Sequence, residues 1–223
     1  MAPNPANVTV YGRLSWPVWT LDEAVARNAK SEYPAADPSS VTAEFNLLLE
    51  QAQLDKFKNH VKTVFLPDCV QREAAGEKRN ALNPKQVQQI LEVLDSDWED
   101  QPPYIPLKPM HEKTKPMAPE ALVSLKVKGP RGADIELKAI VNSEDELAVP
   151  DPDLLAYPVV KPLRSTVHSM YGGCYVAATI NLYTFISGKK PGFSASANTA
   201  VFKADGDRFG GGVSIDTDEI FLD

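Results

Sequence analysis

The segment that most constrains the fold is a long alternating run at residues 174–186 (CYVAATINLYTFI). Its even-numbered positions are apolar except for Thr184, and they comprise Cys174, Val176, Ala178, Ile180, Leu182 and Ile186. Alternation with a period of two predicts a β-strand that buries one face in a core. The odd-numbered face mixes small and polar residues with three aromatic rings, Tyr175, Tyr183 and Phe185.

Further strands are predicted wherever alternation recurs: at residues 8–18, 41–50, 121–128, 135–141 and about 193–202. In the first of them, Val8, Val10, Leu14 and Trp16 are expected on the core face. Tyr11 and Arg13 then fall on the opposite face. Five or six short strands of this kind favour a small Greek-key barrel over a sandwich.

One helical pattern lies between the first and second of these strands, and the others lie between the second and third. A short helix is predicted from Thr20, with Glu23 completing a capping box and Tyr33-Pro34 ending it. Apolar residues recur at helical spacing from Leu54 until Pro67 is expected to stop the run. Another helix is predicted from Asn83-Pro84. The proline-rich residues 101–119 are expected to form an extended loop.

The predicted fold class is therefore mainly β with a helical insertion, an OB-fold barrel followed by a flexible acidic tail. We expect one domain at residues 1–204, with the helical and proline-rich insertion at 51–119. Residues 205–223 are expected to form a glycine-rich joint and an acidic C-terminal tail, because Gly210, Gly211 and Gly212 precede VSIDTDEIFLD.

The charges are segregated along the chain, although the net charge is -7. Residues 154–204 contain no Asp or Glu and carry Lys161, Arg164, Lys189, Lys190 and Lys203. Acids dominate from Asp205 onward, with Arg208 as the only base. A basic stretch within an acidic chain affects which partners the protein attracts electrostatically, but it does not indicate the fold.

The composition excludes several classes of protein. No run of about 18 apolar residues is present, so no membrane contact is expected, and no secretion signal is recognised at the N-terminus. Cys69 and Cys174 cannot build a disulfide framework, so we expect a cytoplasmic protein with reduced thiols.

Catalytic and metal sites are also not expected. Cys174 with His168 could form a thiol nucleophile, but Cys174 lies on the core face of its predicted strand. The acidic run DSDWED at residues 95–100 lacks the glycine and terminal Glu of a calcium loop. We therefore predict no enzyme activity, no cofactor and no metal.

Aromatic rings beside cations are what a single strand of nucleic acid requires, because bases stack on rings while Lys and Arg neutralise phosphates. The residues expected to bind DNA are Tyr11, Arg13, Lys126, Lys128, Arg131, Lys138, Tyr175, Tyr183, Phe185, Lys189 and Lys190. The alternative is that the insertion helices cover the aromatic face. For Lys138, the alternative to DNA binding is an ion pair with Glu136 on a solvated face.

The segment from Tyr171 to Gly212 resembles a family of phage single-stranded-DNA-binding proteins. The resemblance rests on Gly173-Cys174-Tyr175-Val176, Tyr183 and Phe185, Gly188-Lys189, Asp205-Gly206 and Gly210-Gly211. Gly12-Arg13-Leu14-Ser15 and residues 42–49 also look like this family, whereas residues 51–119 do not match it. The resemblance implies an OB-fold, a role in phage replication or recombination, and an acidic tail that recruits partners.

The leading hypothesis is sequence-tolerant binding of single-stranded DNA. A strand-annealing or RNA-binding protein on the same fold, and a phage structural or adaptor protein, remain alternatives. Phage or host replication proteins are expected to bind the tail through Asp218, Glu219, Ile220 and Phe221, unless the tail only aids solubility. The sequence leaves homo-oligomerisation open.

Overall fold

A computed structural model describes residues 4–35, 37–96, 105–110, 112, 114–140, 160–162 and 170–209. The helices in these ranges are α1 (Leu21–Ala29), α2 (Gln51–His60), α3 (Leu66–Ala74) and α4 (Pro84–Asp95), with a π-helical turn (Val61–Phe65) and two 3₁₀ turns (Pro38–Ser40 and Lys115–Met117). The strands are β1 (Asn7–Val18), β2 (Glu44–Glu50), β3 (Leu107–Pro109), β4 (Ala121–Lys128), β5 (Glu136–Ile140), β6 (Val160–Pro162), β7 (Tyr175–Ser187), β8 (Lys190–Ser196) and β9 (Thr199–Ala204).

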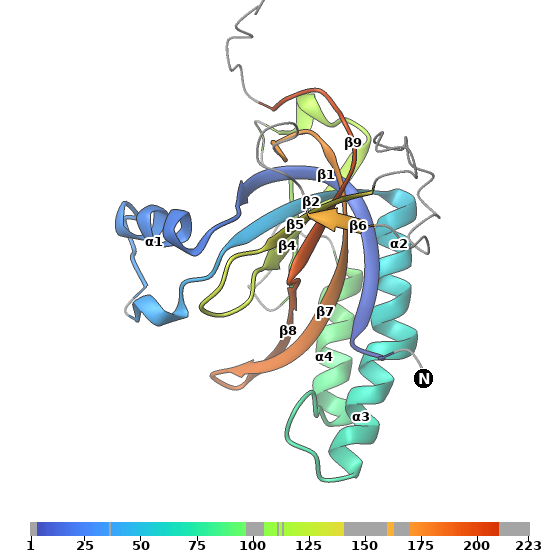
Figure 1. The fold of residues 1–223 in the computed structure, drawn as a ribbon. Helices are drawn as coiled ribbons and strands as arrows, with labels where there is room; N and C mark the ends of the chain where they lie inside the picture. The colour runs from blue at the N-terminus through green and yellow to red at the C-terminus, as the bar shows by residue number, and fades with distance from the viewer. Residues whose placement is uncertain are drawn as a thin grey trace, which may run out of the picture.

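The strands β1, β2, β4, β8 and β7 pair in that order and form a closed ring (Figure 1). β1 closes it, since it pairs with β2 and also with β7. Neighbours in the ring are antiparallel except for β4 and β8, which run parallel. A five-stranded Greek-key ring of this kind is the OB-fold, and the predicted fold class is confirmed. Of the predicted glycine-rich joint and acidic tail at residues 205–223, residues 210–223 lie outside the described residues.

Additional strands extend the ring. β9, β5 and β6 continue the sheet beside β7, and the short β3 pairs with β4. None of the helices in the described part of the chain is long and apolar enough to cross a membrane.

The helices α2 to α4 supply part of the barrel's core. Val176, Ile180 and Leu182 on the even face of β7 are buried, as the alternation predicts. The rings of Phe57 and Phe65 lie 6.5 and 6.0 Å from the ring of Phe193 on β8. Figure 1 shows these helices gathered on one side of the barrel. The helical insertion therefore buries its apolar stripe against the barrel interior.

Both predicted helix starts are confirmed, and each is a capping box. The Thr20 hydroxyl accepts from the Glu23 amide, and the Asn83 side chain accepts from the Gln86 amide. Each box satisfies amides that have no partner within the helix. α1 ends at Ala29, earlier than the predicted stop at Tyr33-Pro34.

The expectation that Pro67 stops the helix is wrong. The chain passes through a π-helical turn, in which the Leu66 amide donates to the Val61 carbonyl, and continues into α3. A proline inside a regular helix clashes with the carbonyl four residues earlier. The wider π turn displaces that carbonyl, so the helix can accommodate Pro67.

Two other segments differ from their predictions. The single strand expected at about 193–202 is two strands, because its pairing with β7 is interrupted between Ser196 and Val201, and the chain also pairs with β5 from Thr199. Between the two strands, the Ala197 amide donates to the Lys128 backbone carbonyl, and the Asn198 carbonyl accepts from the Glu136 backbone amide. In the loop expected at 101–119, the described residues include β3 and a 3₁₀ turn.

The barrel closes at Arg13, which pairs with Leu48 of β2 and with Tyr175 of β7. Just before β7, Gly173 has a φ of +113°. A Cβ there would lie 1.9 Å from the Asp207 carbonyl oxygen. Only glycine allows the segment after β9 to lie this close to the start of β7.

We expect Gly173→Ala to lower the free energy of unfolding by more than about 2 kcal/mol, because the methyl group overlaps backbone that cannot move independently. Gly132→Ala is the matched control: Gly132 has a φ of +71° and no atom within 4 Å of its Cβ position. It should cost only the backbone penalty of about 1 kcal/mol. Urea denaturation measures both. Equal losses for the two variants would show that the close approach to Asp207 contributes nothing.

Candidate nucleic-acid interface

A continuous groove crosses the outer face of β1, β2 and β4. It consists of three hollows of about 320, 410 and 310 Å³. The first two share Arg27, Glu44 and Lys126, and the last two share Ser15, Trp16 and Thr114. We call this surface the barrel groove, and its lining includes Arg27, Glu44, Asn46, Lys108, Ser124, Lys126, Lys128, Trp16, Met117 and Phe209.

The barrel groove carries an excess of positive charge. The carboxylate of Glu44 lies 2.7 Å from the Lys126 ammonium and 3.6 Å from the Arg27 guanidinium. Glu44 is the one acid in the described lining. Lys108 and Lys128 are exposed and form no ion pair within the described residues. Four cations therefore face a single carboxylate, which suits a polyanion.

Trp16 provides an exposed ring in this groove. Its side chain is 59% exposed, and its backbone has a φ of +49°. The prediction that Trp16 belongs to the core face is wrong, because the pairing of β1 with β2 is irregular between Ser15 and Val18. A β-bulge redirects a side chain in this way. The sequence signal for it is Pro17, since proline inside a strand marks an edge or a bulge.

The groove becomes apolar beyond Trp16. Met117 is 41% exposed, and the half-buried ring of Phe209 lies opposite in the same hollow. One face of Phe209 is covered by the Arg13 guanidinium, 4.6 Å from the ring centroid. The groove thus combines a cationic stretch over β2 and β4 with an aromatic and apolar end.

Arg13 does not lie on an open face as the sequence predicts. Its guanidinium is buried and donates to the carbonyl oxygens of Gly173, Met117 and Asp207 at 3.1, 2.7 and 2.9 Å. It also forms an ion pair with Glu120 at 3.2 Å. The residue is enclosed because β1 passes from β7 to β2 at this point. Its contacts are those of a residue that holds the structure together.

Tyr11 and Tyr175 form a stacked pair, with ring centroids 5.5 Å apart and planes at 10°. Both rings are half-buried, and burial raises the pKa of Tyr11 to about 12. Each ring already offers one face to the other, so neither is a fully open platform for a base.

Tyr183 and Phe185 lie on the outer face of β7, outside the barrel groove, and both are half-buried. Lys189 and Lys190 are exposed at the tip of the hairpin formed by β7 and β8. The structure therefore separates these four residues from Lys126 and Lys128.

The remaining predicted cations differ in their surroundings. Lys138 forms the alternative ion pair with Glu136 at 3.0 Å. Arg131 is exposed after β4 and contributes to the lowered pKa of Asp37, which is mainly due to hydrogen bonds from Ser39. Arg131 therefore lies near the loop that follows α1, beside one end of the barrel groove.

Cys174 is buried, and burial raises its pKa to about 11, so its thiol is protonated at neutral pH. His168 lies outside the described residues, as does most of the acidic run at residues 95–100. Within the described ranges, no three His, Cys, Asp or Glu side chains gather as metal ligands would. The tail residues Asp218, Glu219, Ile220 and Phe221 also lie outside these ranges.

The closed ring and its groove define the chain as an OB-fold protein with a basic surface and an exposed indole. Residues 126–221 match the protein family described as the ssDNA-binding protein of Enterobacter phage Enc34. The resemblance to phage single-stranded-DNA-binding proteins is therefore confirmed for the part of the chain from β4 onward. No curated protein sequence matches the chain.

Three solved structures of phage proteins are similar to this chain. The single-stranded DNA-binding protein from bacteriophage Enc34 in complex with ssDNA has a TM-score of 0.50 and 14% identity, and the match covers 92% of this chain and 90% of that one. Another structure of the Enc34 protein has a TM-score of 0.48 and 13% identity, covering 97% and 90%. The single-stranded DNA binding protein gp2.5 of bacteriophage T7 has a TM-score of 0.41 and 10% identity, covering 93% and 97%. The first of these supports the OB-fold.

We expect Arg13→Met to lower the free energy of unfolding by about 3–5 kcal/mol, because it leaves buried carbonyl oxygens and Glu120 without their partner. Arg13→Lys keeps the charge but lacks the planar guanidinium. It should therefore lower the free energy of unfolding less than Arg13→Met does. Urea denaturation measures the effect. A stable Arg13→Met protein with weakened DNA binding would instead favour the phosphate contact that the sequence predicts.

Proposed function

We propose that this protein binds single-stranded DNA in the barrel groove, with little dependence on base sequence. The observation that carries the proposal is the combination of surplus cations over β2 and β4 with the exposed indole of Trp16. Phosphates would contact Lys126, Lys128, Lys108 and Arg27, and a base would stack on Trp16.

The geometry favours a single strand over a duplex. Stacking on Trp16 needs the open face of a base, which the neighbouring base pairs of a duplex cover. Most of the neutral polar side chains in the lining, such as Ser124, carry hydroxyl groups, which can bond to any base and therefore identify none. Binding should therefore depend on charge and stacking rather than on sequence.

Glu44 has a defined part in this proposal. Its carboxylate forms ion pairs with both Lys126 and Arg27 and so positions the two cations in the groove. A phosphate that enters the groove offers the same two cations a second anionic partner. The side chains are thus partly ordered before binding, which reduces the entropy that binding costs.

The family match and the fold likeness support the same function. We propose a non-catalytic role in the replication or recombination of phage DNA, in the cytoplasm of the host cell. The acidic tail would recruit phage or host replication proteins through Asp218, Glu219, Ile220 and Phe221.

The direct test is a titration with single-stranded DNA, duplex DNA and RNA of equal length. Single-stranded DNA should bind most tightly, with a log-log salt slope of roughly -3 to -4 from about four to six phosphate contacts. Lys126→Ala with Lys128→Ala should make this slope shallower by about 1.4, whereas Lys56→Ala with Lys85→Ala, outside the groove, should not. Equal affinity for duplex, or a flat salt response, would contradict the proposal.

Trp16→Ala should weaken single-stranded-DNA binding by about 1–3 kcal/mol, or roughly 5- to 150-fold. Its thermal stability should be retained because the side chain is 59% exposed. Trp16→Phe should keep most of the affinity, since a ring remains. If Trp16→Ala binds normally while Tyr183→Ala does not, the DNA lies on the face that the sequence predicts.

Removal of residues 213–223 should tighten binding at low salt, because the tail's carboxylates compete with phosphates for the groove. The gain should shrink at physiological ionic strength, where the screening length is about 8 Å. Affinity titrations of the full-length and shortened proteins at two salt concentrations measure it. Identical curves would make the tail a solubility device.

A further inference from the structure

A second concave surface lies on the β7 side of the barrel. It consists of a hollow of about 660 Å³ and a smaller one of about 160 Å³, which share Arg79 and Asn181. We call this surface the β7 hollow, and its lining is Asn4, Ala6, Asn7, Arg72, Arg79, Asn80, Lys138, Thr179, Asn181, Ser196, Ala197, Asn198, Thr199 and Val201. It shares no lining residue with the barrel groove.

The lining of the β7 hollow contains cations and neutral polar groups but no acid within the described residues. Arg79 is exposed and forms no ion pair with any described residue. Lys138 forms an ion pair with Glu136, which borders the hollow. Glu136 also accepts a hydrogen bond from the Thr199 hydroxyl at 3.2 Å. Arg79 is therefore the strongest site for an anion in the hollow, and Lys138 is the second.

The neutral groups include amides that are already oriented. The Asn181 side chain donates to the Asn7 side chain at 2.9 Å, across the pair of strands β7 and β1. The side-chain oxygen of Asn181 and the side-chain nitrogen of Asn7 form no hydrogen bond within the described residues. An acceptor and a donor are thus left for the edge of a base.

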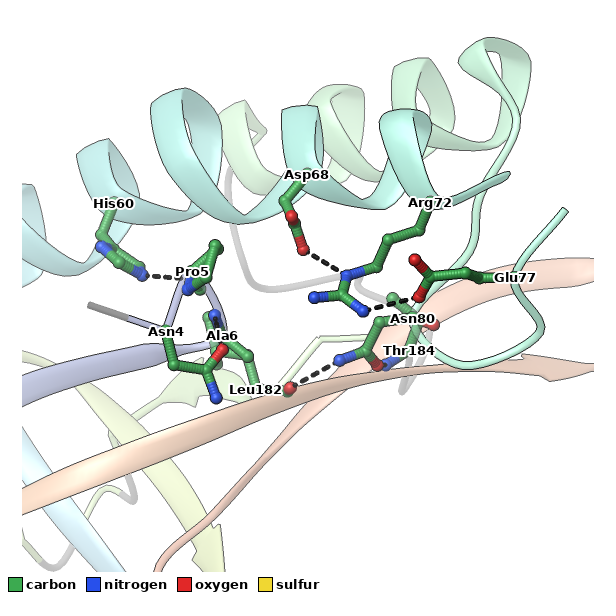
Figure 2. A network of polar contacts seen from close by, with 10 residues as sticks. All are labelled: Asn4, Pro5, Ala6, His60, Asp68, Arg72, Glu77, Asn80, Leu182 and Thr184. Carbon is green, nitrogen blue, oxygen red and sulfur yellow. Dashed lines mark hydrogen bonds and ion pairs between the residues drawn. The ribbon is translucent and has the colours of Figure 1, made fainter. Parts of the chain in front are cut away.

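The wall that carries Arg79 is fixed in place (Figure 2). Its neighbour Asn80 has a φ of +52°, accepts from the Thr184 amide at 3.0 Å and donates to the Leu182 carbonyl at 3.4 Å. These bonds fasten the loop between α3 and α4 to β7. Arg72 is held between Asp68 and Glu77 at 2.6 and 2.7 Å.

The N-terminal segment, which forms another wall, is fixed as well. The His60 ring nitrogen lies 2.9 Å from the Pro5 carbonyl oxygen, and the Leu182 amide donates to the Ala6 carbonyl. Both walls are therefore held by hydrogen bonds within the protein itself. Such pre-organisation lowers the entropy cost of binding.

Aromatic rings lie on the same strand face. Asn181 and Thr179 are two and four residues before Tyr183, and alternate residues of a strand share a face, so Tyr183 and Phe185 follow them on the outer side of β7. Both rings are half-buried. The face thus has cations, base-edge hydrogen-bonding groups and rings in sequence, which together suit a single strand rather than an acidic peptide.

We propose that the β7 hollow is a second contact surface for single-stranded DNA, which holds a stretch of strand outside the barrel groove. Arg79 and Lys138 bind phosphates there, and Asn7 and Asn181 contact base edges. The proposal rests on the proposed function, because it extends the same ligand to another surface of the barrel.

The test uses the full-length protein and two thymidine oligonucleotides, of about six and about twenty nucleotides, which bracket the site sizes of OB-folds. Arg79→Ala with Lys138→Ala should weaken binding of the long strand about tenfold and make its salt slope shallower by about 1.4. Binding of the short strand, which the barrel groove accommodates alone, should be unchanged. Lys56→Ala with Lys85→Ala is the charge-matched control and should leave both unchanged.

An unchanged affinity of the double variant for the long strand would overturn the proposal, and so would an equal loss on both lengths. A wild-type protein that binds neither oligonucleotide would refute the proposed function and this extension together. If the wild type binds the long strand tightly and the Arg79→Ala/Lys138→Ala variant binds it equally well, only the second contact surface is refuted. Circular dichroism and thermal melting should show that the variant is folded. Arg79→Ala alone, at an exposed loop residue, gives a second variant for the same comparison.

Discussion

The buried guanidinium of Arg13 is the contact on which the rest of the structure depends. It lies where β1 leaves β7 and joins β2, so it marks the closure of the barrel. Its hydrogen bonds reach the start of β7, the turn at Met117 and the segment after β9. These segments are distant in sequence, and no strand pairing joins all of them. A charge buried this deeply is stable only while every one of these acceptors remains in place.

This contact gives a structural explanation for the motifs behind the family resemblance. Gly173 supplies one acceptor and Asp207, next to Gly206, supplies another. A Cβ on Gly206 would lie 2.4 Å from the Gly173 carbonyl oxygen, so the two segments meet backbone to backbone. Arg13, Gly173 and Gly206, which carry part of the resemblance, therefore help to close the barrel. The groove proposed to bind DNA depends on them, but most of its lining comes from other residues.

The sequence predicts the barrel better than it predicts the burial and exposure of individual side chains, for one physical reason. Period-two alternation and capping boxes are local, so the strands, the helix starts and the basic residues Lys126 and Lys128 can be predicted from neighbours in the chain. The exposure of Trp16 depends on a bulge, and the burial of Arg13 depends on strands far away in sequence. Likewise, alternation shows that Tyr183 lies on the outer face of β7, but it cannot show that the barrel groove lies elsewhere on the barrel.

Photo-crosslinking would show where on the barrel a bound single strand of DNA lies. A single strand substituted with bromouracil would be bound to the full-length protein, irradiated, and the crosslinked peptides identified by mass spectrometry. If DNA lies in the barrel groove, the most abundant adduct should be on Trp16, with others on the peptides of β2 and β4, because a base stacks on the exposed indole. Adducts confined to the outer face of β7, with none on Trp16 or on the strands of the groove, would contradict binding in the barrel groove.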